Sequence, residues 1–318
     1  MIRIGVIGAG NNGRGHARKF ASMPERCQVV AIADPQRSLA QAACEEVPTA
    51  KPVEDFAQFF DDVDMVVISS PNWMHVDHLE AVVQAGKHVW CEKPVAVNRA
   101  EAQRALDLLE ASSVHSFVGV SVRFNWKQRV MKDYLDSGKL GEPINAFSRR
   151  LHFYQPDKLI DGWRGDAERS GGVIHELITH EVDWICFLLG LPTDIACHAY
   201  SFKKDHPRAN DYVSLLLRYP DGVSGSIEGS HLATAPEFRN GLMGREAALF
   251  TDQWNRYLYF QPAGDKAPTQ LEEAPSFDKH AHFLDVLEGK VKCEADAKYG
   301  ARLALLVEDA LDDATRDR

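Results

Sequence analysis

The sequence lacks the features that mark membrane-spanning, secreted or nucleic-acid-binding proteins. It has no apolar run of about 18 residues, the length that a membrane-spanning helix requires. Its six cysteines are scattered and form no C-x-x-C pair, which favours reduced thiols in the cytoplasm over disulfides. Because Met1 is followed at once by a strand-like run, we expect no signal peptide. The net charge of −10 argues against a nucleic-acid partner, since phosphate binding requires a basic surface.

The chain has 318 residues, of which 45% are hydrophobic, and this length suffices for two domains. Over the first 120 residues, short apolar runs alternate with helical patterns, which is typical of a parallel sheet wrapped by helices. The expected strands are 2–7, 28–33, 64–69, 87–91 and 115–120. The expected helices are 12–22, 36–46, 54–60, 75–85 and 99–112.

Beyond residue 121 the pattern changes to longer strands with fewer helices. We expect strands at 143–153, 194–204, 211–219 and 223–231, helices at 125–136, about 171–189 and 296–314, and a surface loop at 261–276. Such strands favour an open, mostly antiparallel sheet whose second face needs a cover. We therefore predict an α/β chain with a Rossmann domain at 1–121 and an α+β domain at 122–318, assembled into a homodimer or homotetramer through that sheet.

A glycine motif follows the first strand-like run. Gly8, Gly10 and Gly13 form the pattern G-x-G-x-x-G. The first glycine permits a tight turn, the second leaves room for a pyrophosphate, and the third lets the helix approach the strand. Asn11 and Asn12 complete the loop, where N–H groups at the helix start attract phosphates. The pattern predicts a site for a nicotinamide dinucleotide.

Asp34 ends the next apolar run and bears on the choice of cofactor. It lies 21 positions after Gly13, close to the spacing of about 20 residues expected for the acid that binds the adenosine ribose. Because a carboxylate there repels the additional phosphate of NADP, we predict NAD as the cofactor. Arg37 lies nearby and could accept that phosphate, which leaves NADP as the alternative.

Two later loops follow strands of the same predicted sheet, and the carboxyl ends of parallel strands line the ligand crevice. The residues expected to bind the cofactor there are Ser70, Pro71, Asn72, His75, Glu92 and Lys93. We expect Lys93 to stand beside the nicotinamide. The alternative for Lys93 is a solvated loop lysine next to a glutamate.

A third polar segment lies on the helix predicted at about 171–189. Glu176 and His180 are four residues apart and share a helix face, whereas His175 and His180 are five apart and do not. The segment therefore misses the i, i+4 histidine spacing of a zinc site, and we expect no metal. The alternative is an amphipathic helix whose polar residues face solvent.

Basic residues flank this third segment. Arg123 follows the last strand of the first domain, and Trp163 and Arg164 precede a glycine pair. Together with His180, these residues are expected to bind substrate, although surface exposure is the alternative for each arginine. Further positive charge comes from Arg149, Arg150 and Lys158. This charge suggests an acidic group, such as that of a sugar acid.

Together these motifs resemble the glucose–fructose oxidoreductase/inositol dehydrogenase family, known as Gfo/Idh/MocA, over nearly the whole chain. The most specific part is Glu-Lys-Pro at 92–94. The resemblance implies that Lys93 contacts substrate and nicotinamide ribose, and that Glu176 and His180 complete the site. The family most often has Asp at position 176 and usually Gly at 178, where this chain has Glu176 and Ile178. A longer carboxylate and a bulkier helix surface would alter the pocket, so inositol cannot be assumed as substrate.

The resemblance implies an NAD(P)-dependent oxidoreductase that transfers a hydride between nicotinamide and a secondary alcohol or ketone of a sugar, polyol or sugar acid. We expect His180 to act as general base and Lys93 to stabilise negative charge on the substrate oxygen. Glu176 would orient His180 or bind a neighbouring hydroxyl, and Lys93 as the proton-transferring residue stays open. The alternatives are a non-catalytic regulator that binds dinucleotide or sugar, and a reductase of a C=N or C=C bond.

Overall fold

The computed structural model describes residues 1–153, 163–200 and 211–316, and the chain divides into two compact units. The first unit is Met1–Gly119 with Asp278–Leu305, and the second is Val120–Phe277 with Leu306–Arg318. We expected a single boundary between residues 121 and 122. In the structure, residues 278–305 also belong to the first unit. The cofactor and substrate roles of the two parts stay predictions.

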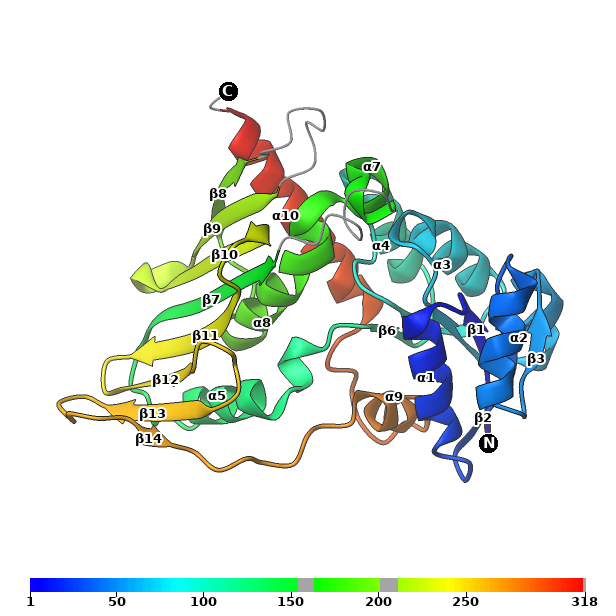
Figure 1. Cartoon of the computed structure of the whole chain (residues 1–318), viewed down its shortest axis with the longest axis horizontal. Coiled ribbons are helices and arrows are strands. Elements are labelled where there is room, and N and C mark those ends of the chain that lie inside the picture. Colours follow the sequence, from blue (N-terminus) through cyan, green and yellow to red (C-terminus); the bar gives the residue numbers. More distant parts are fainter. Residues whose placement is uncertain (154–162, 201–210, 317–318) are drawn as a thin grey trace. The chain divides into compact units, whose positions relative to one another are not determined.

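Six parallel strands form the sheet of the first unit, in the order β3-β2-β1-β4-β5-β6 (Figure 1). The strands are β1 Ile2–Ile7, β2 Cys27–Ala33, β3 Lys51–Val53, β4 Met65–Ile68, β5 His88–Cys91 and β6 Ser116–Val118. The strand order reverses between β1 and β4, and ligands of such sheets bind outside the carboxyl ends of the strands at this point. The predicted Rossmann fold is confirmed. The three-residue edge strand β3, which contains Pro52, was not predicted.

Helices connect these strands, and their apolar spacing explains how they pack. The helices are α1 Asn11–Ala21, α2 Arg37–Glu46, α3 His75–Gln84 and α4 Arg99–Glu110, with shorter 3₁₀ turns η1 Phe56–Asp62 and η2 Asn72–Met74. Helix α4 begins where the Asn98 side chain accepts a hydrogen bond from the Glu101 N–H, at 2.9 Å. It then buries Ala102, Ala105 and Leu109 on one face. All four residues of β4 are buried, as expected of a strand covered on both faces.

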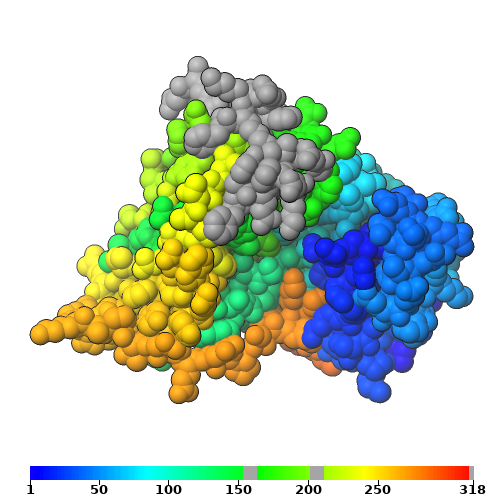
Figure 2. Space-filling view, in the orientation of Figure 1, coloured from blue at the N-terminus to red at the C-terminus, as the bar shows by residue number. Residues whose placement is uncertain are grey.

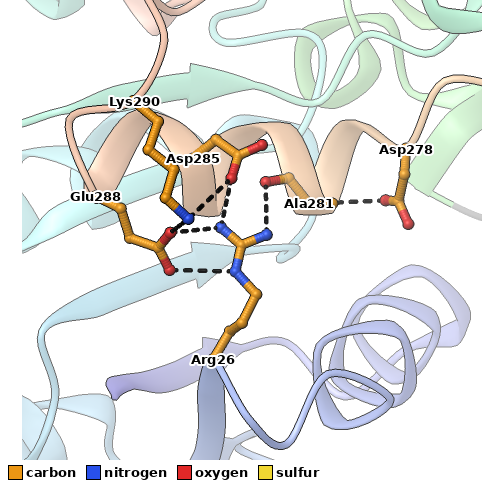
Figure 3. Close-up of polar contacts among 6 residues, drawn as sticks. All are labelled: Arg26, Asp278, Ala281, Asp285, Glu288 and Lys290. Carbon is orange, nitrogen blue, oxygen red and sulfur yellow. Dashed lines mark hydrogen bonds and ion pairs between the residues drawn. The ribbon is translucent and has the colours of Figure 1, made fainter.

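A segment close to the C-terminus completes the first unit. Helix α9 (Lys279–Leu287) begins at Asp278, whose carboxylate accepts hydrogen bonds from backbone N–H groups of the first turn. The Arg26 guanidinium reaches this helix from the turn before β2 (Figure 3). Its Nη2 lies 2.7 Å from Asp285 Oδ1 and 2.9 Å from Glu288 Oε2. Helix α9 was not predicted.

The second unit contains an eight-stranded sheet in the order β14-β13-β12-β11-β7-β10-β9-β8 (Figure 1). The strands are β7 Pro143–Phe153, β8 Asp194–Tyr200, β9 Tyr212–Arg218, β10 Ser224–Ala233, β11 Glu237–Gly244, β12 Ala247–Thr251, β13 Leu258–Pro262 and β14 Thr269–Gln270. All neighbouring pairs are antiparallel except β7 with β10, which confirms the mostly antiparallel sheet. The strand predicted at 194–204 extends beyond the described residues, and strands β11 to β14 were not predicted.

The helical segments of the second unit are η3 Val122–Phe124, α5 Trp126–Asp136, η4 Trp163–Gly165, α7 Ala167–Ser170, the π turn η5 Ile174–Ile178, α8 Thr179–Leu189 and η6 Pro220–Gly222. The last helix, α10 Ala297–Arg316, contains the boundary between Leu305 and Leu306. Within the described ranges, no helix has both the length and the apolar character needed to cross a membrane.

Glycines on β10 make room for the helix that packs on this sheet. A Cβ on Gly229 would lie 1.9 Å from Ile178 Cδ1, and one on Gly225 would lie 2.8 Å from Ile185 Cγ2. Both isoleucines are fully buried. The bulk of Ile178 is therefore accommodated in the sheet, which corrects the expectation that this side chain alters the pocket.

The opposite face of the sheet carries exposed apolar side chains. Leu216 on β9 is 40% exposed and Met243 on β11 is 44% exposed. The strand register places both on the face of Phe147, away from the glycines of β10. The turn between β13 and β14, at the edge of the sheet, is exposed and is drawn in orange in Figure 2. The surface loop predicted at 261–276 contains the short strand β14.

Candidate functional site

The glycine loop between β1 and α1 has the shape that a pyrophosphate requires. Gly8 has a φ of +95°, and a Cβ there would lie 2.6 Å from a backbone oxygen of the segment after β4. A Cβ on Gly13 would lie 1.8 Å from the Gly8 carbonyl oxygen. Gly10 is exposed and faces open space, and Asn11 and Asn12 beside it are also exposed. The loop therefore fits a dinucleotide phosphate at the start of a helix.

Asp34 lies directly after β2, and its carboxylate holds the neighbouring backbone. Oδ2 accepts a hydrogen bond from the Ala9 N–H and Oδ1 from the Gln36 N–H, each at 2.9 Å. Because each carboxylate oxygen has two lone pairs, both can still accept from ribose hydroxyls. Arg37 is exposed and lies 3.4 Å from Glu54 in a solvated ion pair, which is weak.

Two histidines hold the loop after β4. The Ser70 side chain lies 2.8 Å from His78 Nδ1, and the Ser70 carbonyl lies 2.8 Å from His75 Nε2. His75 is 1% exposed, and its Nδ1 lies 2.7 Å from the Pro94 carbonyl. Its ring nitrogens thus face protein backbone, whereas we expected His75 to contact the cofactor. Asn72, in the same loop, is buried.

Lys93 follows β5 and is half-buried between two buried neighbours, Glu92 and Pro94. The Lys93–Pro94 peptide bond is cis. Glu92 Oε1 accepts hydrogen bonds from His16 Nε2 at 2.9 Å and from Trp90 Nε1 at 3.1 Å. The Glu92 carboxylate thus points into the protein, which favours an internal role over the predicted contact with cofactor.

Three residues predicted for the substrate side lie together in the second unit. Arg164 Nε is 2.8 Å from Glu176 Oε1, and the Arg164 guanidinium carbon is 4.3 Å from the Trp163 ring centroid. The Arg164 side chain is 45% exposed and that of Glu176 is 16% exposed. The group combines an ion pair, an aromatic ring and partial solvent access, which suits the binding of a hydroxyl-rich ligand.

Glu176 lies in the π turn η5, a helical distortion that is frequent at functional sites. Glu176 and His180 were expected to share a face of a regular α-helix, but the π turn changes the residue spacing on which that expectation depends. His180 is the second residue of α8 and is 8% exposed. His175 Nε2 lies 2.7 Å from Glu308 Oε1, so the turn is fastened to the last part of α10. The helix predicted at 171–189 is thus two segments.

Arg123 has a different environment from the one predicted. It is 4% exposed, and its Nε lies 3.0 Å from Asp183 Oδ2 on α8. Its guanidinium carbon also lies 4.9 Å from the Phe187 ring centroid. This buried pair joins η3 to α8, which favours a structural role over substrate binding.

The other basic residues near the third segment are also paired with carboxylates of the chain. Arg149 Nε lies 2.5 Å from Glu228, and Arg150 Nη1 lies 2.8 Å from Glu181. Lys158 lies outside the described residues. These pairs balance the arginine charges locally, so the two arginines do not favour an acidic substrate.

Sequence analysis missed His16, although a signal for it exists. Helix α1 buries Gly13, His16, Ala17 and Phe20, which are spaced three, four and seven residues from the first. A histidine in that apolar pattern indicates a buried polar contact. As far as the described residues extend, no group of three or more His, Cys, Asp or Glu side chains is placed to hold a metal ion.

Comparison with known proteins matches two family models to successive parts of the chain. Residues 2–120 match the family described as "Oxidoreductase family, NAD-binding Rossmann fold", and residues 128–250 match "GFO/IDH/MocA C-terminal domain". An inositol 2-dehydrogenase of Rhizobium meliloti (strain 1021) is 30% identical over 243 residues, which cover 73% of this chain and 70% of that protein.

Two further similarities concern levoglucosan dehydrogenase. The enzyme of Pseudarthrobacter phenanthrenivorans is 25% identical over 280 residues, which cover 83% of this chain and 71% of that protein. A solved structure described as levoglucosan dehydrogenase in complex with NADH and L-sorbose has a TM-score of 0.87 and 20% identity. The similarity covers 100% of this chain and 97% of that one, and it shows the shared fold.

Proposed function

Because the chain belongs to the Gfo/Idh/MocA family of NAD-binding oxidoreductases, we propose a substrate class for its reaction on CH–OH groups. The chain oxidises a secondary alcohol of a sugar, polyol or sugar acid, or reduces the matching ketone. The observation that carries this proposal is the glycine loop at the reversal of strand order, with Lys93 at the end of β5 in the same sheet. When bound, the nicotinamide accepts or donates the hydride.

NAD is the cofactor that the ribose-binding region favours. Asp34 places a carboxylate at the end of β2, and a 2′-phosphate beside it would be repelled. Arg37 is a nearby cation that could offset this repulsion, and its exposed ion pair with Glu54 is weak. The Asp34 carboxylate is therefore the feature that supports NAD over NADP.

Among the proposed substrates, uncharged sugars and polyols are favoured. The relatives described above are named for inositol and levoglucosan, both of which are uncharged. In this chain, Arg123, Arg149 and Arg150 are each paired with a carboxylate of the same chain. Arg164 also has a carboxylate partner, Glu176, although it is partly exposed. A substrate carboxylate would therefore have to displace an existing ion pair.

For the chemistry, we assign His180 as the general base that removes the proton of the substrate hydroxyl, because imidazole titrates close to neutral pH. Lys93 hydrogen-bonds the same oxygen and stabilises the negative charge that develops on it. Glu176, held by Arg164, accepts a hydrogen bond from a neighbouring hydroxyl of the substrate. Proton transfer by Lys93 itself is the variant of this mechanism.

A substrate panel tests this function. The wild-type protein is assayed for NADH formation with NAD and a series of polyols, sugars and sugar acids, and for NADH consumption with ketones, imines and activated alkenes. We expect turnover of an uncharged polyol or sugar, lost in Lys93→Met. Turnover restricted to imines or alkenes would establish a different reductase. NAD binding without turnover of any compound would favour a regulator.

We also propose that a second copy covers the open face of the second unit's sheet, giving a homodimer or homotetramer. Leu216 and Met243 are exposed on that face, and exposed apolar patches favour protein contacts. Leu216→Arg should lower the mass measured by light scattering. Leu191→Arg is the matched control, because Leu191 is 50% exposed and lies outside the sheet strands. A wild-type monomer at micromolar concentration would contradict the proposal.

A further inference from the structure

The two residues that flank Lys93, Glu92 and Pro94, each contact a histidine from another element. On the N-terminal side, the Glu92 carboxylate accepts a hydrogen bond from His16 Nε2 on α1. His16 lies three residues after Gly13 of the glycine loop. The other ring nitrogen of His16, Nδ1, lies 2.8 Å from His280 Nε2 on α9. The His16 ring therefore bridges the residue before Lys93 and helix α9.

On the C-terminal side, His75 has the corresponding position. Its Nδ1 lies 2.7 Å from the Pro94 carbonyl and its Nε2 lies 2.8 Å from the Ser70 carbonyl. Carbonyl oxygens only accept hydrogen bonds, so a neutral ring donates to one of them and an imidazolium donates to both. His75 thus joins the loop after β4 to the loop after β5, which contains Lys93.

We propose that His16 and His75 are positioning residues that hold the backbone on either side of Lys93, so that its ammonium group is presented at a fixed place. We call the set His16, Glu92, Pro94 and His75 the lysine clamp. The inference rests on the proposed role of Lys93 in the reaction. It gives Glu92 and His75 a task other than the cofactor contact that sequence analysis assigned to them.

The charges and hydrogen bonds around Glu92 indicate specific contacts rather than incidental packing. Burial alone would raise the pKa of Glu92, but attraction to His16, the hydrogen bonds and the charge of Lys279 outweigh it and lower the pKa. The carboxylate therefore stays ionised although the residue is only 7% exposed. An ionised buried carboxylate requires fixed partners, because losing one leaves an uncompensated charge. The Trp90 indole, fully buried, donates the second hydrogen bond.

The clamp also connects the two sites that must act together. Helix α1 starts at the glycine loop expected to hold the pyrophosphate, and His16 on that helix holds the residue before the lysine. A shift of about 1 Å at a reacting group can cost about 10²-fold in rate. Loss of the clamp should therefore lower turnover while the glycine loop still binds NAD.

The experiment observes Lys93 directly and needs no substrate. Lysines of the folded, NAD-saturated protein are reductively methylated with ¹³C-formaldehyde, and the resonance that is missing in Lys93→Met is assigned to Lys93. The test variants are His16→Gln and His75→Gln, because both N–H groups of a glutamine side chain belong to one nitrogen, which cannot occupy the positions of both ring nitrogens. The matched control is His88→Gln, at the opposite end of β5, where His88 Nδ1 accepts from the His115 N–H at 3.1 Å.

We expect the Lys93 resonance to move or broaden in both test variants and to keep its position in the control. With a substrate found in the panel, kcat should fall about 10-fold or more, up to the 10²-fold cost of misplacement, while the NAD dissociation constant stays within about 2-fold. If a test variant fails to fold by circular dichroism, Glu92→Gln, which removes the charge and keeps the shape, takes its place.

An unchanged Lys93 resonance in folded His16→Gln and His75→Gln would overturn the clamp. A loss of activity that only follows the fraction of unfolded protein would do the same, because that is the behaviour of a purely structural contact. Failure of the proposed function is a separate outcome: full activity in Lys93→Met would remove the lysine from the mechanism, whatever the resonance shows.

Discussion

The contact between Gly229 on β10 and Ile178 in the π turn gives the sharpest test of how the second unit is packed. Gly229→Ala adds a Cβ that would lie 1.9 Å from Ile178 Cδ1 and 2.5 Å from its Cγ1. Ordinary contact begins at 3.4 Å. Because two atoms of the side chain are too close, rotation of the terminal methyl alone does not relieve the clash. Ile178 is fully buried, so its neighbours restrict any movement.

Overpacking of this kind costs about 1–3 kcal/mol of unfolding free energy. For a unit of this size, each 1 kcal/mol lowers the midpoint of thermal unfolding by about 2–4 °C. Ile178→Ala removes both clashing atoms, Cδ1 and Cγ1, and by itself should cost about 2–5 kcal/mol. In the Gly229→Ala background the same change should cost less, because it also removes the clash. We therefore expect the two substitutions to be non-additive by about 1 kcal/mol or more.

The assay is urea and thermal unfolding of wild type, both single variants and the double variant. Gly15→Ala is the control, because no atom lies within 4 Å of the added Cβ and alanine favours the helix. It should leave stability unchanged or raise it by up to about 1 kcal/mol. Additive losses in the double variant, or an unchanged midpoint in Gly229→Ala, would refute the packing argument.

Three further outcomes follow from the described contacts. Asp34→Ser should narrow the preference for NAD over NADP, measured as the ratio of the two dissociation constants; an unchanged ratio would contradict the role of the carboxylate. Lys93→Met and His180→Ala should each lower turnover about 10²–10⁴-fold with NAD affinity retained, and the double variant should lose little more, because the residues act as a unit. Parallel loss of NAD affinity would contradict this. The free energy of unfolding should decrease as the pH is lowered. Burial lowers the pKa of His78 from 6.5 to about 4 and that of His280 from 6.5 to about 3, so between these values and 6.5 the unfolded chain binds more protons than the folded one. Stability is thus complete above about pH 6.5 and lost as the pH falls toward 3, and a urea midpoint constant between pH 7 and 4 would contradict the assignment.

Much of the first unit could be predicted because its signals are local. The glycines at 8, 10 and 13 specify a turn through their own backbone freedom and small size, and the strands of a parallel sheet are continuous apolar runs. The missed elements have weak local signals. Strand β3 has three residues including Pro52, and β14 has two. The main local signal of helix α9 is its N-terminal cap, Asp278. The contact of Arg26 with this helix joins residues that are far apart in the sequence, so it is visible only in the structure.

The sequence by itself determined the fold class, the dinucleotide motif and the likeness to a dehydrogenase family, since each depends on residues close together in the chain or on a linear pattern. The tertiary structure decided which polar side chains are paired with other residues of the chain. Arg123 was expected to bind substrate, but its partner, Asp183, is 60 positions away. Glu92 and His75 were expected to meet the cofactor, but their partners come from α1 and from neighbouring loops. Such pairings depend on which segments the folded sheet brings together, and no spacing along a single chain specifies them.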